Sequence, residues 1–373
     1  MLMKVVAGKT IQAQILETLR DRLASLPEGS RFQTEHELCI EFGVARTTMT
    51  RVMVKLVEEG LLHRIPGRGS FVQRIKKLSV PITFLLPCAD FLSETFADAM
   101  AQNTRRILKG ASQVAFEYDC GMVTVPVSPT NNLHDIDWRK LDFINSESKV
   151  LAYGYWYGDL FPLLRERGCK VSFVETQTCY LNTYADCLES WFVLTVDRIG
   201  AMKSAVKRLT ELGCRRIALA HGNIDEKDHP ALLGYKSGLK ECGHRYSAAV
   251  NTSDASNETI AGIIADFYKQ NKFDALLLDP RYIFKLRTQH SLNRYLGLPE
   301  NVKIIVDYET GYNHSFFPSL SSMDFPYEEI GRAAAQRLQE DKFRPGRQIF
   351  GGRIIEREST MHETERLTLI TAN

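Results

Sequence analysis

Arginines and threonines lie on one side of a short helical pattern near the start of the chain. In "ARTTMTRVMVKLVEEG" (45–60), successive residues of a helix turn by about 100°, which puts four polar residues on a common arc: Arg46, Thr47, Thr50 and Arg51. Arginine can donate to phosphate or to guanine O6 and N7, and threonine suits phosphate or a thymine methyl group. The spacing predicts a helix surface that contacts DNA.

A second stretch, "HRIPGRGSFV" (63–72), has the pattern of a hairpin with a tip at Pro66-Gly67-Arg68-Gly69. Glycine allows the positive φ values that a tight tip needs, and it lets the backbone approach a partner closely. We expect Arg68 to reach the DNA backbone or the minor groove from this tip.

Three helical patterns precede the hairpin and would position both stretches. The first, "TIQAQILETLRDRL", spaces Ile11, Ile15, Leu19 and Leu23 four apart, and "LPEGSRF" ends it. The second, "TEHELCIEFG", opens with a capping box of Thr34 and Glu37. The third carries an apolar face opposite the polar arc. Three helices followed by a hairpin predict a winged helix-turn-helix at residues 1–75, with a linker at 76–79.

The distribution of charge agrees with a polyanion partner for this module. Residues 1–79 carry 13 Lys and Arg against 8 Asp and Glu, a net +5, whereas the rest of the 373-residue chain carries 34 against 37, a net −3. A small basic module joined to a larger acidic one suggests nucleic acid as the partner of the first. A solvated basic surface without a partner is the alternative.

The segment "EHELCIEFGVARTTMTRVMVKLVEEGLLHRIPGRGSFV" resembles the GntR family of bacterial regulators, over roughly residues 8–74. Together with the polar arc, the resemblance implies these DNA contacts: Glu35, His36, Arg46, Thr47, Thr48, Thr50, Arg51, Gly67, Arg68, Gly69 and Ser70. The chain departs from the family at Ala45, where Ser or Thr usually caps the helix, and at Thr50, where Arg is frequent. A winged helix used only for protein contacts is the alternative.

The remaining residues predict an α/β domain of parallel, doubly wound sheets. Short apolar strand patterns such as "ITFLLP", "KVSFVE", "DALLLD" and "VKIIVDY" alternate with helical ones such as "AMKSAVKRLTELG". No run of about 18 apolar residues exists, and the start of the chain lacks the features of a signal peptide. The eight cysteines are scattered without a CxxC motif, so we expect reduced thiols in a cytoplasmic protein.

Three segments, "VDRIGAMKSAVKRLTELGCRRIALAHGN", "GYKSGLKECGH" and "PSLSSMDFPYEEIGRAAAQRL", resemble the effector domain of the LacI family. That domain has the fold of the periplasmic sugar-binding proteins. The resemblance implies an effector-binding and dimerisation domain at 80–373. Its first subdomain would hold about 80–190 and 325–342, and its second about 191–324 and 343–373. It also implies a ligand in the cleft between them and a homodimer that binds a palindromic operator.

The effector-binding residues follow less directly from the resemblance. In "VDYETG", Glu309 stands where the family uses an acid to bind the effector, whereas Ala231 and Pro280-Arg281 replace other usual contacts. Aromatic residues after a strand could stack on a sugar ring, although packing in the core or on the surface would explain them equally. The candidates for effector contact are Phe91, Tyr155, Trp156, His229, Arg281 and Glu309.

Nothing in the sequence indicates catalysis. The histidines lack metal-ligand spacing, no GxSxG or P-loop motif is present, and an aminotransferase-like domain would need a longer chain. We expect no metal and no cofactor. The sequence therefore predicts a homodimeric transcriptional regulator, a repressor of carbohydrate genes that responds to a small sugar-like effector. The alternative is a small-molecule sensor that does not use its basic module for DNA.

Overall fold

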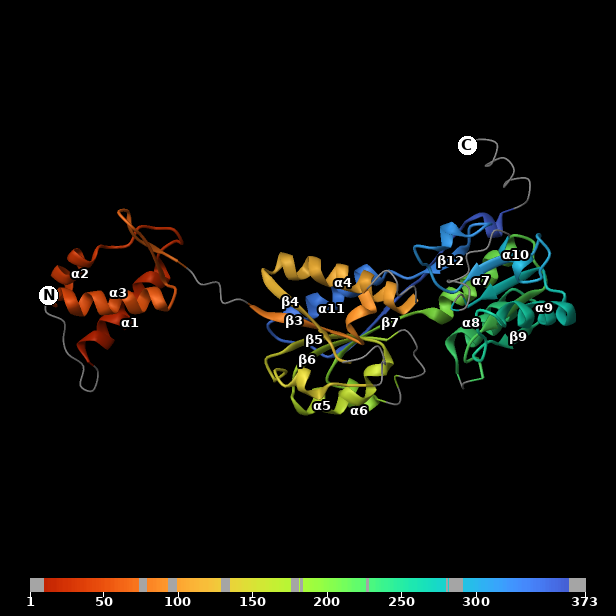
Figure 1. Ribbon diagram of the computed structural model, residues 1–373, viewed down its shortest axis with the longest axis horizontal. Coiled ribbons are helices and arrows are strands. Elements are labelled where there is room, and N and C mark those ends of the chain that lie inside the picture. The colour runs from red at the N-terminus through yellow and green to blue at the C-terminus, as the bar shows by residue number, and fades with distance from the viewer. Residues whose placement is uncertain are drawn as a thin grey trace, which may run out of the picture. The chain divides into compact units, whose positions relative to one another are not determined.

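The computed structural model describes residues 10–73, 79–92, 99–128, 135–175, 181, 184–225, 228–279, 281 and 291–361. The chain forms two compact units, Met1–Ser79 and Val80–Asn373, which are described separately (Figure 1). Of the helices within the described residues, none is long and apolar enough to cross a membrane. Residues 76–78 of the predicted linker lie outside the described residues, and Ser79 already begins a strand.

The first unit is a winged helix, as predicted. Its helices are α1 (Ile11–Ser25), α2 (Glu35–Phe42) and α3 (Arg46–Glu58), and its hairpin pairs β1 (Leu62–Ile65) with β2 (Gly69–Val72) in antiparallel register. The capping box at the start of α2 is present, with Thr34 Oγ1 accepting from Glu37 N at 3.3 Å. Ala45 gives α3 no side-chain cap. The apolar faces of the helices enclose a core of their own around Leu19, Val52 and Leu56.

One residue of the predicted apolar face of α1 does not belong to this core. Ile11 is 50% exposed, whereas Leu16 is buried beside Ile15. Ile11 is the first residue of the helix, directly after the cap Thr10. The members of the core cluster on α1 begin at Ile15.

The second unit contains two six-stranded sheets. The first sheet has the order β13-β7-β6-β5-β3-β4 and the second β14-β12-β11-β10-β8-β9. The strands of the first are β3 (Ser79–Leu86), β4 (Cys120–Pro126), β5 (Lys149–Tyr153), β6 (Lys170–Val174), β7 (Phe192–Val196) and β13 (Gly346–Phe350). Those of the second are β8 (Ile217–His221), β9 (Ala248–Asn251), β10 (Ala275–Leu278), β11 (Lys303–Val306), β12 (Ser321–Asp324) and β14 (Arg353–Ile355).

Both sheets are predominantly parallel, as the alternation of strands and helices predicts. The pairs from β3 through β5 and β6 to β7 and β13 are parallel, and so are those from β9 through β8 and β10 to β11 and β12. The edge strand β14 is antiparallel to β12. Strands with buried residues on both faces, such as β7, β8 and β10, form the centres of the sheets.

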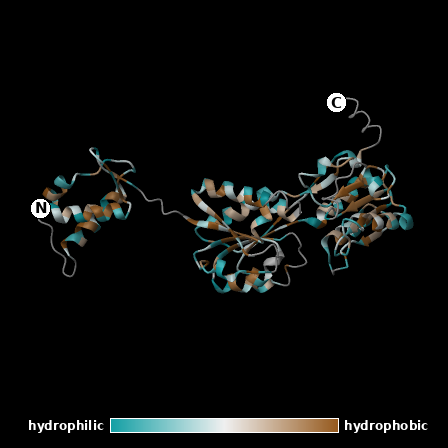
Figure 2. Cartoon of the chain, viewed as in Figure 1, coloured by the Kyte–Doolittle hydropathy of each residue, from teal (hydrophilic) through white to brown (hydrophobic). Residues whose placement is uncertain are grey.

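Helices cover both faces of each sheet. In the first lobe, defined by the first sheet, α4 (Ala99–Glu117) and α11 (Tyr327–Gln339) lie on one face, and α5 (Phe161–Glu166) and α6 (Ala185–Leu188) on the other (Figure 1). In the second lobe, α7 (Arg198–Glu211) and α8 (Pro230–Glu241) lie opposite α9 (Ile260–Asn271) and α10 (Leu292–Tyr295). Figure 2 shows hydrophobic strands with more polar residues along the helices.

The boundary expected between the subdomains was wrong at two strands. We expected residues 191–324 and 343–373 in the second subdomain, but β7 pairs with β6 of the first sheet and β13 pairs with β7. The chain therefore crosses between lobes after β7, after β12 and after β13. At the first and third crossings, Asp197 N donates to Phe350 O at 2.8 Å, so these two connections lie side by side.

Two glycines let α4 and α11 pack at backbone contact. A Cβ atom on Gly331 would lie 2.0 Å from Ile107 O, and one on Gly110 would lie 1.9 Å from Glu328 O. Both obstacles are main-chain carbonyls of the facing helix, so no side-chain rotation could relieve them. Each helix thus contributes one glycine to a contact that fixes the distance between them.

Gly331→Ala should lower the free energy of unfolding of the second unit by about 1–3 kcal/mol or more, because overpacking forces the helices apart. Gly262→Ala is the matched control, since Gly262 is also helical but is exposed with nothing within 4 Å of its Cβ position. The control should gain about 0.5–1 kcal/mol from helix propensity. Equal urea-unfolding midpoints for the two variants would contradict this account of the α4–α11 contact.

Candidate functional site

The predicted DNA-contacting arc of α3 lies on the surface of the first unit. Arg46, Thr47 and Arg51 are exposed, and Thr48 and Thr50 are partly buried. The opposite side of the helix is anchored in the core by four buried residues: Met49, Val52, Met53 and Leu56. The arc is therefore held rigidly and remains accessible, and its contact with DNA stays a prediction.

The hairpin presents the second predicted contact. Its register pairs Ile65 with Gly69, which leaves 66–68 as the tip. Gly67 and Gly69 have φ values of 73° and 112°, which side-chain-bearing residues rarely adopt. Arg68 is exposed at this tip, and Ser70 is partly buried in β2. These are the positions that a wing needs to reach a nucleic-acid backbone.

Glu35, which the resemblance places at the DNA, is engaged within the protein. One carboxylate oxygen accepts from Arg64 Nη2 on β1, and the other accepts from Thr50 Oγ1 on α3 at 3.0 Å. Glu35 thus links the start of α2 to both α3 and the wing, whereas its neighbour His36 is exposed. Arg64 was not predicted from the sequence, because it stands 29 residues from its partner.

In the second lobe, ionisable residues lie where three neighbouring strands end. His221 is the last residue of β8, Asp279 directly follows β10, and Asp307 directly follows β11. These strands are adjacent and parallel, so their carboxyl ends share one edge of the sheet. Ligands of open α/β sheets bind at this edge. We call these three residues, with Arg198, His229 and Arg281, the strand-end cluster.

His221 faces hydrogen-bond acceptors with both ring nitrogens. Its Nε2 lies 2.9 Å from Asp307 Oδ2, and its Nδ1 lies 2.7 Å from Gly222 O and 3.8 Å from Asp279 Oδ2. A carbonyl and a carboxylate can only accept, so both nitrogens carry a proton in this arrangement. Burial opposes the charge of His221, but Asp279 and Asp307 outweigh it and raise its pKa above the usual value.

Arg198, the first residue of α7, is completely buried beside Asp307. Its Nη1 donates to Asp307 Oδ2 at 2.5 Å, and its guanidinium lies 4.7 Å from the ring centre of Tyr308 and 5.4 Å from that of Phe325. Within the described residues, its Nε and Nη2 have no hydrogen-bond partner, and neither has Asp307 Oδ1. We call the edge formed by Nε and Nη2 the free edge of Arg198.

Two of the predicted effector residues belong to this cluster. The ring centre of His229 lies 4.9 Å from that of His221, and its Nδ1 is buried without a partner among the described residues. Burial, reinforced by the positive charges of His221 and Arg198, lowers the pKa of His229 to about 4. The half-exposed Arg281 donates from Nε to Asp279 Oδ2 at 2.7 Å. His229 is therefore neutral beside a charged group.

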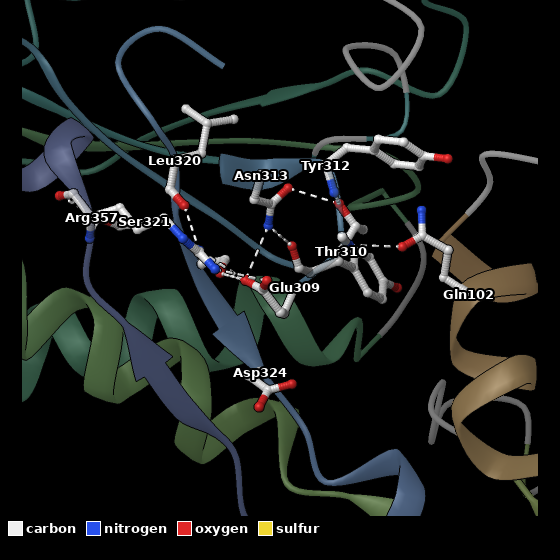
Figure 3. Close-up of polar contacts among 12 residues, drawn as sticks. Gln102, Glu309, Thr310, Tyr312, Asn313, Leu320, Ser321, Asp324 and Arg357 are labelled. Atoms are coloured by element: carbon white, nitrogen blue, oxygen red, sulfur yellow. Dashed lines mark hydrogen bonds and ion pairs between the residues drawn. The ribbon is translucent and has the colours of Figure 1, made fainter. Parts of the chain in front are cut away.

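Glu309 lies in the loop after β11 and is held by the C-terminal segment (Figure 3). Arg357 donates from Nη2 to Oε1 at 2.8 Å and from Nη1 to Oε2 at 2.9 Å, and Ser322 Oγ also donates to Oε2. Two residues further along the loop, Gly311 N donates to Gln102 Oε1 on α4 at 3.1 Å. The loop thus contacts the first lobe. A ligand would share Glu309 with Arg357, and its effector role stays a prediction.

The remaining candidates are aromatic. Phe91 is buried in a small cluster with Cys88 and Ala101. Tyr155 and Trp156 lie in a 3₁₀ turn, Tyr155–Leu160, that follows β5, and their side chains lie outside the described part of the structure. Their contact with an effector is untested.

Sequence reasoning missed several members of the site. Arg198, His221, Asp279 and Asp307 were not among the residues predicted to bind the effector. A usable signal existed, because "ALAH", "ALLLD" and "IIVD" each place an ionisable residue at the end of a buried strand. Arg357 carries no such local signal. In the described part of the chain, no group of three His, Cys, Asp or Glu side chains could hold a metal ion.

Family comparisons agree with this two-part architecture. Residues 11–72 match the profile of the bacterial regulatory proteins of the gntR family, and residues 206–360 match that of the periplasmic binding protein-like domain. Both resemblances found in the sequence are thereby confirmed.

Relatives and solved structures extend the comparison. The HTH-type transcriptional repressor NagR of Bacillus subtilis is 37% identical over 68 residues, which span 18% of this chain and 28% of NagR. The arabinose metabolism transcriptional repressor of Halalkalibacterium halodurans is 22% identical over 94% of both chains. The crystal structure of the transcription regulator CcpA of Lactococcus lactis superposes with a TM-score of 0.56 at 17% identity, over 76% of this chain and 100% of CcpA. This last likeness shows the fold.

Glu309→Gln should destabilise the second unit, because it leaves the largely buried Arg357 guanidinium without its charged partner. We expect the free energy of unfolding to fall by about 1–3 kcal/mol. Glu166→Gln, at an exposed position of α5, is the control and should change it by less than about 0.5 kcal/mol. Wild-type thermal stability of Glu309→Gln would mean that the Arg357 contact contributes nothing.

His221 should make the stability of the second unit depend on pH. Because its folded-state pKa is raised, its contribution is fully present below the unfolded value of 6.5 and is lost as the pH rises through the folded value. Urea unfolding between pH 6 and 9 should show this decline in the wild type, and His221→Gln should flatten it. His314→Gln, at an exposed position of the same unit, should keep the wild-type slope. A wild-type slope in His221→Gln would refute the assignment.

Proposed function

We propose that this chain, which joins a gntR-family winged helix to a periplasmic binding protein-like domain, is a sequence-specific DNA-binding transcriptional regulator. It represses carbohydrate genes, and a small polar, sugar-like effector in its second unit modulates its binding to the operator. The observation that carries this proposal is that one chain contains both features: an exposed, rigidly anchored α3 arc, and a strand-end cluster with buried polar atoms that make no hydrogen bond within the described part of the chain.

The DNA-binding half rests on charge and geometry. The net +5 of residues 1–79 supplies the non-specific attraction to phosphate. Arg46 and Arg51 at the surface of α3 would read base edges or contact phosphate in the major groove, while Arg68 would follow the backbone from the wing. Glu35 would position Arg64 and Thr50 rather than contact DNA itself, because both of its oxygens already accept hydrogen bonds.

The effector-binding half rests on the strand-end cluster. Unpartnered buried polar atoms are rare in native proteins and call for a water or a ligand. The loop after β11 carries Asp307 in the cluster and Gly311 in contact with α4. A ligand at Asp307 would therefore act on the loop that makes the Gly311–Gln102 contact between the lobes. It can change DNA affinity only by the difference in its affinity for two arrangements of the protein.

Exposed apolar side chains at the end of α4 and on the edge strand β4 would suit a homodimer. Phe116, at the end of α4, is 87% exposed, Tyr118 follows at 52%, and Val123 lies on the edge strand β4 at 44%. Large exposed apolar side chains are candidates for an interaction surface. A two-fold symmetric dimer would bind a palindromic operator whose half-site spacing matches its own symmetry. The proposed function needs no catalytic step, and the protein would act in the cytoplasm.

Selection of genomic fragments by the full-length protein tests the proposal. Enrichment of a two-fold symmetric sequence is the expected result, and Arg46→Ala should weaken binding to it by about 1–3 kcal/mol, with a smaller loss on random DNA. Arg165→Ala removes the same charge from an exposed position of α5 and should bind as the wild type does. Failure to enrich any sequence would favour a small-molecule sensor that does not use its basic module for DNA.

A further inference from the structure

We propose that the effector carries a negatively charged group, a carboxylate or a phosphate, which the free edge of Arg198 receives at the strand-end cluster. This inference rests on the proposed function, because it concerns the ligand of the same regulatory site. It narrows a sugar-like effector to a sugar acid or a sugar phosphate.

The buried charges of the cluster balance, and its remaining positive charge lies at an exposed position. Arg198 and the doubly protonated His221 contribute two positive charges, and Asp307 and Asp279 contribute two negative ones. Arg281, whose side chain is 40% exposed, adds a third positive charge beside Asp279. The cluster as a whole is therefore net +1, which favours an anionic ligand over a cationic one.

The free edge of Arg198 has the shape of an anion receptor. Nε and Nη2 lie side by side on a planar group, so they can donate in parallel to two oxygens of one carboxylate or phosphate. Asp307 occupies only Nη1, and Tyr308 and Phe325 hold the plane of the guanidinium between their rings. Arg198 therefore cannot turn its free edge elsewhere without breaking these contacts.

Neighbouring atoms would complete the site for a hydroxylated anion. Asp307 Oδ1 can accept from a hydroxyl group, and His229 Nδ1 can donate to one or accept from one. Burial is the main cause of the depressed pKa of His229; the positive charges of His221 and Arg198 lower it further, whereas Asp307 and Asp279 raise it. A bound anion should raise this pKa as well.

One carboxylate of the first lobe competes with this interpretation. Glu175, which follows β6, is 1% exposed and could serve as an internal counter-ion for the cluster. In that case Glu175 would already supply the negative charge that the free edge of Arg198 attracts, and its removal would create an anion site that the wild type lacks. The test therefore includes Glu175→Gln.

The experiment uses small probes, so that it does not depend on the stereochemistry of an unknown sugar. Inorganic phosphate and D-glycerate are titrated into the full-length protein, with glycerol as the neutral counterpart of glycerate. The ring signals of His221 and His229 in nuclear magnetic resonance report binding at the cluster itself, so phosphate bound to the basic first unit does not interfere. We expect both anions to shift these signals saturably. Glycerol should bind at least about tenfold more weakly than glycerate.

Arg198→Lys keeps the charge but removes the paired donors, and it should weaken anion binding by about tenfold or more. If this variant fails to fold, Arg198→Met combined with Asp307→Asn removes the ion pair without leaving an unpaired buried charge, and it should abolish the response.

Three results would overturn the proposal: no response to either anion, equal affinity for glycerol and glycerate, or unchanged anion affinity in the Arg198 variants. An anion response only in Glu175→Gln would overturn it as well and would identify Glu175 as the counter-ion. Fragment selection measures operator binding separately. If the effector is neutral, the protein still enriches an operator but does not respond to anions; if the proposed function is wrong, it enriches no operator.

Discussion

The ion pair between Arg198 and Asp307 is the interaction on which the second unit depends. Asp307 ends a central strand of the second sheet, and Arg198 is the first residue after the chain has crossed from the first lobe. Their side chains are 0% and 1% exposed, so the desolvation cost is high and the pair needs close geometry to offset it. Asp307 also holds His221. One carboxylate therefore joins a lobe crossing, a strand end and the proposed ligand site.

Parts of the fold that depend on signals local in the sequence could be predicted, and parts that depend on pairing between distant segments could not. The winged helix could be predicted almost to the residue, because caps, periodicity and the glycine-rich tip are local signals. The parallel sheets could be predicted as a class for the same reason. The sheet to which β7 belongs could not, since the strand pattern does not show that the chain crosses to the second lobe only after β7, and the partner on its other side, β13, lies about 150 positions away. β9 and β14 are only four and three residues long, so they show too little alternation to be recognised.

The candidate site divides in the same way. His229, Arg281 and the arc of α3 could be proposed from sequence, and the structure places the first two in one cluster. The partners that decide what Glu35 and Glu309 can do could not be, because Arg64 and Arg357 stand 29 and 48 residues away. A resemblance transfers a position and its residue type, but it does not show which neighbour already occupies the side chain. Glu35 and Glu309, whose partners are distant in the chain but adjacent in the fold, thus hold other side chains in position.

The glycine contact between α4 and α11 has a consequence for synthesis of the chain. Lys109 on α4 and Glu328 on α11 form an ion pair across this contact over 219 residues, and β13, which completes the first sheet, ends only at Phe350. Ribosomes add roughly 5–20 residues per second, so α4 must wait on the order of ten seconds or more for its partner. Residues 10–72, which belong to a compact unit of their own, can fold long before. During this interval the nascent chain carries a finished winged helix, while the part of α4 that α11 covers stays exposed, which makes this part a natural substrate for chaperones.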